Sequence, residues 1–245
     1  MSSHPEWIVP DWPAPANVKA VITTRAGGVS RGPFASLNLG LRTGDDPQAV
    51  AANRARLHAA LPQEPKWLRQ VHGCGVVDAD TLAGTPEADA SIARRAGTVC
   101  VVMIADCVPV LLTDRDGTAV AVAHAGWRGL AGGVIENTVS ALGRDPGGLL
   151  AYLGPGIGPR AFEVGPDVRD ALLTCDPQAT AAFAPHAPGK WLADLFLLAR
   201  QLLQRAGVDS IHGGGMCTYS DAARFFSYRR DRMTGRMAAL IWRTD

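Results

Sequence analysis

A cysteine and a histidine interrupt two of the most apolar stretches of the chain. Cys107 follows Asp106 inside MIADCVPVLL (103–112), and His124 interrupts VAHAGWRGL (122–130). An aspartate has low β-propensity, and a charge buried in an apolar stretch is costly unless it has a partner. Residues that break the local pattern in this way indicate where a functional site is most worth looking for.

A third residue with metal-binding chemistry, His72, lies at a glycine-interrupted turn in KWLRQVHG (66–73). Two imidazoles and one thiolate at the ends of strands are what a zinc site with an open fourth position needs. The separations of His72, Cys107 and His124 match no compact zinc-finger pattern, so spacing alone leaves a buried thiol and two unrelated histidines as the alternative. The unusual neighbours of Cys107 and His124 favour a site.

Three arginines are candidates for binding an anion beside such a site. Arg128 follows His124 closely and lies between glycines at a predicted helix start, where free N–H groups, the helix dipole and a guanidinium attract anions. Arg25 begins the glycine-rich loop RAGGVS, and Arg54 lies on a predicted helix. An ordinary surface arginine is the alternative for each, and the sequence favours it for Arg25 and Arg54 taken individually.

Length and composition are those of a globular protein. The chain has 245 residues, 47% of them hydrophobic and 19% charged, with a formal net charge of +1. That balance argues against a nucleic-acid partner. The N-terminal stretch shows no secretory signal, and no apolar run is long enough to span a membrane. With five cysteines in no paired spacing, we expect a reduced, cytoplasmic protein.

The elements that must position these residues alternate irregularly. Valine-rich runs at 98–104, 108–113 and 118–124 predict strands of a sheet covered on both faces. Further strands are predicted at 18–24, near 149–153, and on either side of 231–236; amphipathic helices are predicted at 45–61, 130–143, 165–175 and 191–208. We therefore expect an α/β (α+β) fold with mixed sheets and helices outside, in one domain over residues 1–245.

Six motifs, in order along essentially the whole chain, resemble one family. They are TRAGGVSRGPFASLNLG, WLRQVHG, ADCVPVLL, VAHAGWRGL, LGPGIGPRAFEVG and CTYSDAARFFSYRRDRMTGRMAALIW. The set is similar to that of the laccase-like, or multicopper polyphenol oxidase, family. It is also described as the purine nucleoside phosphorylase family related to the human protein FAMIN and, in bacteria, as the peptidoglycan editing factor family.

The resemblance implies a four-layer α-β-β-α sandwich and a zinc ion held by His72, Cys107 and His124. It also implies phosphorolysis of purine nucleosides (adenosine, inosine, guanosine and methylthioadenosine) to the free base and ribose 1-phosphate, with hydrolytic deamination of adenosine. The chemistry suits the residues, because zinc activates water or polarises a substrate oxygen and arginines hold phosphate. The expected partners are therefore purine nucleosides and phosphate.

Other functions remain open at this point. A four-copper laccase needs many imidazoles, whereas the chain has six histidines. One His₂Cys set forms at most a single copper centre, and copper binding there would be adventitious. A cysteine hydrolase would use Cys107 as nucleophile and His124 as base, and in bacteria it would remove a wrongly added amino acid from a peptidoglycan precursor. A non-enzymatic metal-binding protein is the remaining alternative.

The segment CTYSDAARFFSYRRD (217–231) is the candidate wall of the substrate pocket. Phe225, Phe226 and Tyr228 offer faces that can stack on a purine, and Arg229 and Arg230 follow them. If the segment is a strand, Phe226 and Tyr228 point to one side and Phe225 to the other. The alternative for each aromatic residue is the core of the sandwich.

Overall fold

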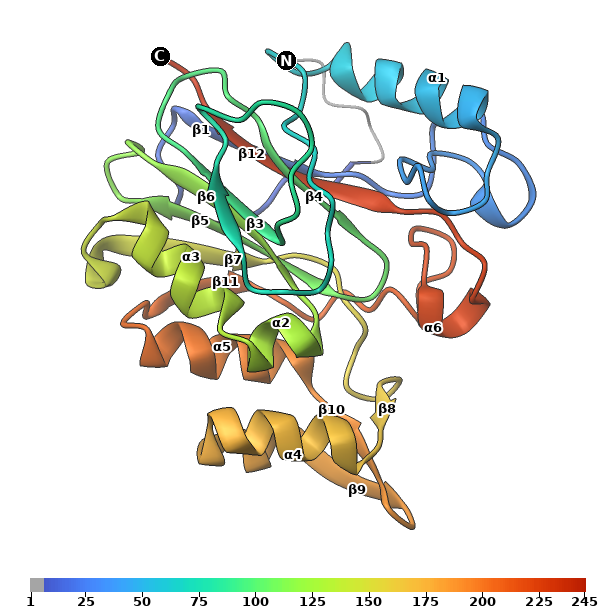
Figure 1. Cartoon of the computed structure of the whole chain (residues 1–245), viewed down its shortest axis with the longest axis vertical. Coiled ribbons are helices and arrows are strands. Elements are labelled where there is room, and N and C mark those ends of the chain that lie inside the picture. Colours follow the sequence, from blue (N-terminus) through green and yellow to red (C-terminus); the bar gives the residue numbers. More distant parts are fainter. Residues whose placement is uncertain (1–6) are drawn as a thin grey trace.

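The structure of the protein is a computed structural model that describes residues 7–245. The first part of the N-terminal stretch, for which we predict no secretory signal, lies outside the described residues. Two sheets stacked face to face form the centre of the molecule, and helices lie outside them (Figure 1).

The larger sheet has six strands, and two of the three predicted metal ligands lie at ends of its strands: His124 near the end of one strand and Cys107 directly before another. Its strands are β2 (Val76–Asp78), β3 (Ala90–Ala93), β5 (Val108–Asp114), β6 (Val120–Ala125), β7 (Leu149–Leu153) and β11 (Ser210–Gly213). They are arranged in the order β11–β7–β5–β6–β3–β2. The β11–β7 and β2–β3 pairs are parallel and the others antiparallel, so the sheet is mixed as predicted.

The smaller sheet is antiparallel, and its middle strand comes from the far end of the sequence. Its strands are β1 (Val18–Ile22), β12 (Met237–Arg243) and β4 (Cys100–Ile104), in the order β1–β12–β4. Buried side chains from both sheets interdigitate between them, among them Ile22, Ile104, Leu111, Val122 and Ile241. The predicted strands 98–104 and 108–113 therefore lie in different sheets, and the chain crosses between the layers at Asp106 and Cys107.

Helices cover the outer face of each sheet, which gives the expected four layers. Helix α1 (Pro47–His58) begins at the N-cap Asp46, and its Leu57 packs on the outer face of the three-stranded sheet. The helices α2 (Trp127–Ala131), α3 (Val134–Leu142), α4 (Pro166–Cys175) and α5 (Leu195–Arg205) supply apolar side chains to the core on the other side. The α-β-β-α fold class is thus confirmed, while the extent of the single domain, 1–245, stays a prediction.

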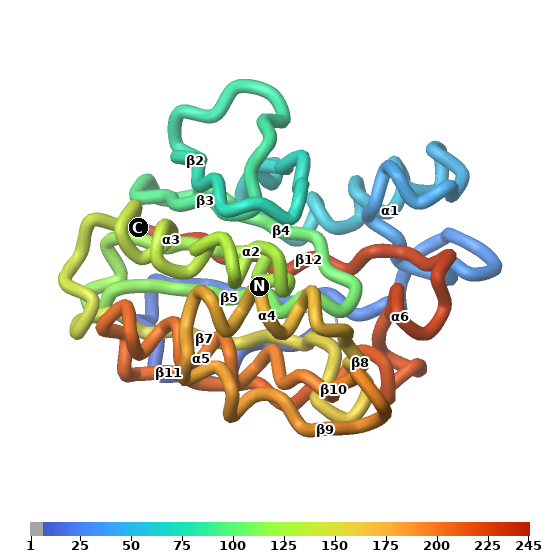
Figure 2. Tube along the Cα trace, turned by 60° about the horizontal axis from the view of Figure 1, so that its bottom comes forward, coloured from blue at the N-terminus to red at the C-terminus, as the bar shows by residue number. Residues whose placement is uncertain are grey.

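A small third sheet lies beside α4 at one end of the molecule. It consists of β8 (Glu163–Val164), β10 (Lys190–Ala193) and β9 (Phe183–Ala187), in the order β8–β10–β9. Short 3₁₀ segments occupy Gly32–Phe34, Pro146–Gly148 and Pro177–Ala182. In Figure 1 α4 and this sheet lie together at the bottom of the molecule, far from α1 at the top, and in Figure 2 they are turned toward the viewer.

Three predicted elements differ in the structure. The helix expected at 191–208 is shorter, because Trp191–Ala193 belong to strand β10 and α5 begins only after its N-cap Asp194. The helix expected at 130–143 is divided into α2 and α3, because Gly133 adopts a left-handed conformation with φ of 89° between them. The strand expected before 231–236 is absent: the segment forms the short helix α6 (Tyr228–Asp231), which Ser227 caps by accepting a hydrogen bond from the Arg230 N–H. A side chain that caps a helix favours that conformation over an extended one. Among the described residues, no helix is long and apolar enough to cross a membrane.

Candidate metal centre

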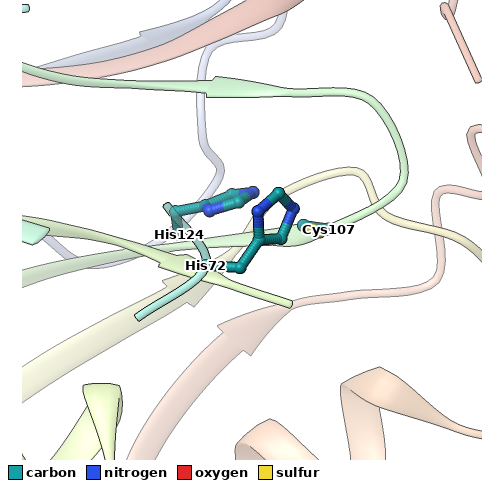
Figure 3. A group of neighbouring side chains, drawn as sticks. All are labelled: His72, Cys107 and His124. Carbon is teal, nitrogen blue, oxygen red and sulfur yellow. The ribbon is translucent and has the colours of Figure 1, made fainter. Parts of the chain in front are cut away.

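Three segments bring His72, Cys107 and His124 to one point. His72 lies in the turn before β2 with a positive φ of 60°, Cys107 lies in the crossover from β4 to β5, and His124 is the penultimate residue of β6. The register of β5 and β6 pairs His124 with Pro109, two residues beyond Cys107. One ligand atom from each of the three residues lies within 4.8 Å of the others. Figure 3 shows the three side chains gathered together.

A buried carboxylate, Asp89, orients both histidines. The Nδ1–H of His124 donates to Asp89 Oδ1 over 2.9 Å, so Nε2 is the ring nitrogen left to bind a ligand. The backbone N–H of His72 donates to the same oxygen over 3.0 Å, and Gly73 N–H donates to Oδ2 over 2.7 Å. Asp89 is 0% exposed; burial acts to raise its pKa, but the bonds from His124 and the backbone outweigh burial and lower it. The sequence analysis missed Asp89. The feature that could have pointed to it is an aspartate directly before the apolar strand β3.

The charges of the cluster favour a thiolate at Cys107. Burial acts to raise the pKa of this thiol, but the charge of His124 and hydrogen bonds from His124 and His72 outweigh burial, so the pKa falls. For His124, burial acts to lower the pKa, and Cys107 together with Asp89 raises it instead. The thiolate, not the thiol, is the form that binds a metal, so the electrostatics prepare Cys107 for that role.

The donor set fits a metal ion. Two imidazoles and a thiolate suit zinc or copper, and three protein ligands leave a fourth position for water or substrate. The carboxylate behind His124 is the support that metal-binding histidines usually have. Gly126 adjoins the cluster closely, since a Cβ at this position would come within 2.7 Å of the Cys107 sulfur. The three predicted residues thus form a group that could hold a metal ion.

Asp106 fixes the conformation of the crossover between β4 and β5, which contains Cys107. Its φ of 96° is unusual for a residue other than glycine, and its carboxylate accepts bonds from the Thr218 hydroxyl and the Arg229 N–H, each over 2.6 Å. Its carbonyl accepts the N–H of Ile157 over 2.7 Å. Contacts with two distant segments, one at Ile157 and one at 217–231, offset the backbone strain at this residue. Asp106 therefore holds Cys107 in place.

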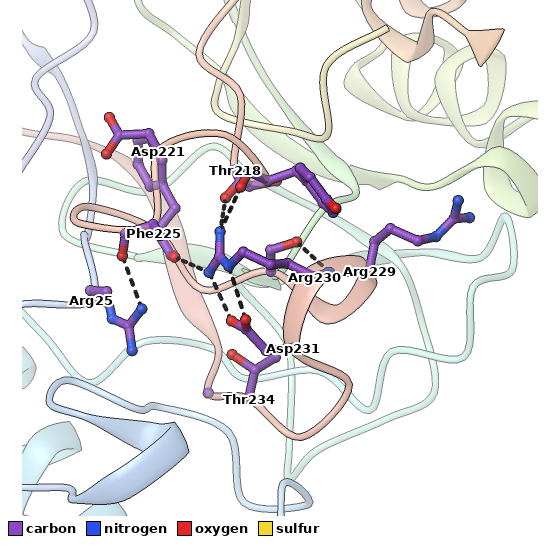
Figure 4. A network of polar contacts seen from close by, with 12 residues as sticks. Arg25, Thr218, Asp221, Phe225, Arg229, Arg230, Asp231 and Thr234 are labelled. Carbon is purple, nitrogen blue, oxygen red and sulfur yellow. Dashed lines mark hydrogen bonds and ion pairs between the residues drawn. The ribbon is translucent and has the colours of Figure 1, made fainter. Parts of the chain in front are cut away.

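The segment that anchors Asp106 is itself tied together by Arg230. Its guanidinium donates to the carbonyls of Thr218, Tyr219 and Phe225 and forms an ion pair with Asp231. Figure 4 shows this guanidinium at the centre of the network. The Arg229 side chain points away from it and donates to the Glu163 carbonyl of β8. Both arginines thus brace the backbone around the centre.

The three arginines predicted to bind an anion lie in different environments. Arg128 is exposed at the start of α2, and its Cζ is 4.3 Å from the centroid of the Trp127 ring. Arg25 donates to the carbonyls of Ala35 and Ala222. Arg54 donates to the Leu39 carbonyl, and burial lowers its pKa to about 10. Arg25 and Arg54 thus use part of their guanidinium groups on the backbone, and the contact of all three with phosphate stays a prediction.

The aromatic residues of the 217–231 segment divide between the core and the surface. Phe225 and Phe226 are 0% exposed and belong to the core between the two main sheets. Tyr228 is 49% exposed. Because the segment is not a strand, the predicted alternation of Phe226 and Tyr228 is wrong. Tyr228 is thus the one of the three that is open to a substrate.

The other four cysteines lie outside the metal-binding group. Cys74, Cys100, Cys175 and Cys217 are free thiols, and burial raises the pKa of Cys100 to about 12. The Cys217 sulfur accepts hydrogen bonds from the Gly158 N–H and from both the N–H and the hydroxyl of Ser220. Cys217 thereby joins the loop after β7 to the turn at 217–220, which agrees with a structural role.

The sandwich and its three-donor centre define the class of protein. The chain belongs to the family described as multi-copper polyphenol oxidoreductase laccase, whose model matches residues 19–244. Among the relatives, the chain is 56% identical to Purine nucleoside phosphorylase PA4543 of Pseudomonas aeruginosa, over 98% of this chain and 99% of that protein. It is 55% identical to Purine nucleoside phosphorylase YfiH of Escherichia coli, over 96% and 98% of the two chains.

Solved structures share the whole fold. Protein NMB0706 of Neisseria meningitidis superposes with a TM-score of 0.95 at 53% sequence identity, covering 98% of this chain and 100% of that one. YlmD of Geobacillus stearothermophilus superposes with a TM-score of 0.92 at 34% identity, covering 100% and 98%. The family predicted from the six motifs is confirmed.

Proposed function

We propose that this protein is a zinc-dependent purine nucleoside phosphorylase that cleaves adenosine, inosine, guanosine and methylthioadenosine. The observation that carries the proposal is the three-donor centre in a chain that matches relatives of that name over nearly their whole length. His72, Cys107 and His124 would hold the zinc, because their donor set is the one that a catalytic zinc site with an open position uses. Copper would also bind these ligands, and we expect that binding to be adventitious.

In this reaction a phosphate oxygen attacks the ribose C1′ while the bond between C1′ and the purine nitrogen breaks. The bonding electrons pass to the base, which leaves with a proton, and ribose 1-phosphate remains. Zinc, when bound, supplies a Lewis acid that polarises an oxygen or lowers the pKa of water. Arg128, at the start of α2, would hold the phosphate oxygens, with Arg25 and Arg54 as further contacts. Positioning the two reactants accounts for much of the rate gain in such a displacement.

Hydrolytic deamination of adenosine is the second reaction that we propose for the same centre. Water would attack C6 of adenine, and ammonia would leave; a zinc ion held by His72, Cys107 and His124 would supply the Lewis acid that makes water more nucleophilic. The reaction needs no phosphate, so the arginines matter less to it. Inosine has no amino group at C6 and therefore isolates phosphorolysis from deamination.

The close contact between Cys107 and His124 favours one rival function, a cysteine hydrolase acting on peptidoglycan precursors. Its reaction would use the Cys107 thiolate as the nucleophile, and the lowered pKa of this thiol suits that role as well as metal binding. Polyphenol oxidation by a four-copper cluster has less support, because His72, Cys107 and His124 are the only such group found among the described residues.

The test is inosine cleavage by protein purified without added metal and then loaded with zinc. We expect phosphate-dependent release of hypoxanthine with an equal amount of ribose 1-phosphate, and loss of both products after chelation. Inosine that stays intact at every phosphate concentration, together with cleavage of a peptidoglycan precursor by metal-free protein, would establish the hydrolase instead.

A further inference from the structure

Arg236 lies immediately before β12 and is held in a defined position. Its N–H donates to the Oδ1 of the buried Asn38 over 2.8 Å. Its side-chain stem packs on Gly40 so closely that a Cβ at Gly40 would come within 2.8 Å of the arginine Cγ. An arginine with a packed stem loses little conformational freedom when it binds a ligand.

The guanidinium of Arg236 has no carboxylate partner. Its Nη1 donates to the carbonyls of Thr234 and Gly235, each over 3.0 Å. Over residues 7–245 no ion pair and no further side-chain hydrogen bond involves Arg236, which leaves donors of Nε and Nη2 available. A partly buried cation without a counter-ion is costly, so an anion bound at this point stabilises it.

The pairing of β12 with β4 brings Arg236 near the metal centre, because the next residue, Met237, pairs with Ile104, three residues before Cys107. Burial lowers its pKa, while the negative charges of Cys107 and Asp106 act to raise it. The positive charge thus lies within the field of the metal ligand Cys107 and of the residue that holds it. An anion bound here would be close to the open coordination position.

An exposed aromatic ring lies beside the guanidinium. The Arg236 Cζ is 5.8 Å from the centroid of Tyr228, and the Cζ of the exposed Arg232 is 5.9 Å from the same centroid. Arg229, next to Tyr228 in the sequence, is bound through its N–H to Asp106, so this ring lies close to the crossover. Tyr228 therefore gives the space beside Arg236 an apolar wall.

We propose that Arg236 binds the oxyanion of inorganic phosphate at the metal centre, beside the wall formed by Tyr228. The identity of this anion as a co-substrate rests on the proposed function, whereas its binding does not. The guanidinium group can donate to two phosphate oxygens at once. Because the aliphatic part of the side chain is packed, the guanidinium needs no change of conformation to bind phosphate. Arg236 would thus supply positive charge from the start of β12, whereas Arg128 lies at the start of α2.

Equilibrium dialysis of inorganic phosphate against zinc-loaded protein tests the proposal directly. We expect Arg236→Gln to raise the phosphate Kd about ten- to a hundredfold with unchanged zinc content, as for the loss of a charge-assisted bond. Arg236→Lys keeps the charge but not the fork and should weaken binding less. Arg232→Gln is the matched control, because it removes an exposed charge at nearly the same distance from Tyr228. It should change the Kd for phosphate less than about twofold.

The assignment would be overturned if Arg236→Gln bound phosphate with the wild-type Kd. It would also be overturned if Arg236→Gln and Arg232→Gln lost phosphate affinity equally. If Arg236→Gln loses zinc, Arg236→Lys decides: weakened phosphate binding at full zinc content supports the proposal, and unchanged binding or lost zinc contradicts it. Inosine kinetics separate the two claims. Wild-type protein that binds phosphate but releases no base contradicts the proposed function, whereas an active Arg236→Gln with an unchanged KM for phosphate contradicts the inference alone.

Discussion

The Nδ1 of His124 lies 2.9 Å from Oδ1 of the fully buried Asp89, and the same carboxylate accepts the N–H groups of Val71, His72 and Gly73. One side chain therefore sets the ring orientation of one histidine and the backbone of the other. Metal-binding histidines depend on such support, so Asp89 belongs to the centre although it contributes no ligand.

Replacing Asp89 with Asn should weaken zinc binding about ten- to a hundredfold, the usual effect of losing a carboxylate behind a metal-binding histidine. Competition with a zinc chelator of known affinity measures the change. Asp114→Asn is the control, because Asp114 is also a buried carboxylate with a lowered pKa. Burial acts to raise that pKa, but hydrogen bonds from Thr118, Ala119 and Arg144 outweigh burial and lower it. An equal loss of zinc affinity in both variants would show a general effect on stability.

Zinc should bind at one ion per chain in the wild-type protein and not in a triple alanine variant of His72, Cys107 and His124. Among single variants, Cys107→Ser should weaken binding most, because the thiolate is the strongest donor of the three. Metal analysis by mass spectrometry, on protein that remains folded by circular dichroism, measures the stoichiometry. Full zinc content in the triple variant would place the ion elsewhere.

Bound zinc should protect Cys107 from alkylation, and a chelator should expose it, because the free thiolate is reactive and the coordinated one is not. Peptide mapping after iodoacetamide treatment identifies the labelled cysteine. Cys100, which is buried with a raised pKa, should stay unlabelled in both states and serves as the internal control. Equal labelling of Cys107 with and without zinc, or a stable thioester with substrate, would favour the hydrolase.

Arg128→Ala should raise the KM for phosphate and lower the rate of inosine cleavage, since a charge-assisted bond of about 1.5–3 kcal/mol is lost, or roughly ten- to a hundredfold. Deamination of adenosine should suffer less because water replaces phosphate. Steady-state kinetics of both reactions on one preparation give the comparison. If both rates fall equally, Arg128 supports the metal centre and not the phosphate.

The two aromatic residues Phe226 and Tyr228 should respond in opposite ways to alanine. Phe226→Ala should reduce the free energy of unfolding by about 3–5 kcal/mol, because it opens a cavity in the core. Tyr228→Ala should leave stability nearly unchanged and raise the KM for nucleosides. Urea unfolding and inosine kinetics measure the two effects. A destabilised Tyr228→Ala with an unaltered KM would remove Tyr228 from the pocket wall.

The sequence predicted the layers and the three donors because both rest on local patterns. Valine-rich runs are typical of covered strands, and Cys107 and His124 stood out by breaking such runs. Asp89 was missed because its partners lie across the turn at His72 and the end of β6, contacts that no local pattern encodes. The same reason applies to Arg236, which is adjacent to the centre only through the pairing of β12 with β4.

Local pattern also gave a wrong prediction where side-chain bonds decided the conformation. Phe225 and Phe226 in an apolar segment predict a strand, yet the Ser227 cap and the Arg230 bonds fold the segment into a turn and α6. Similarly, the strands at 98–104 and 108–113 looked like neighbours in one sheet. The left-handed backbone at Asp106 instead sends the chain from one layer to the other.

The position of β12 between β1 and β4 has a consequence for synthesis on the ribosome. Until residues 237–243 have been made, β1 and β4 have no common neighbour to pair with, and their edges stay open. The β5–β6 hairpin, by contrast, closes a short loop and brings Cys107 and His124 together early. The nascent chain thus acquires two metal donors well before the smaller sheet can form. Until then the exposed edges of β1 and β4 leave the chain open to aggregation.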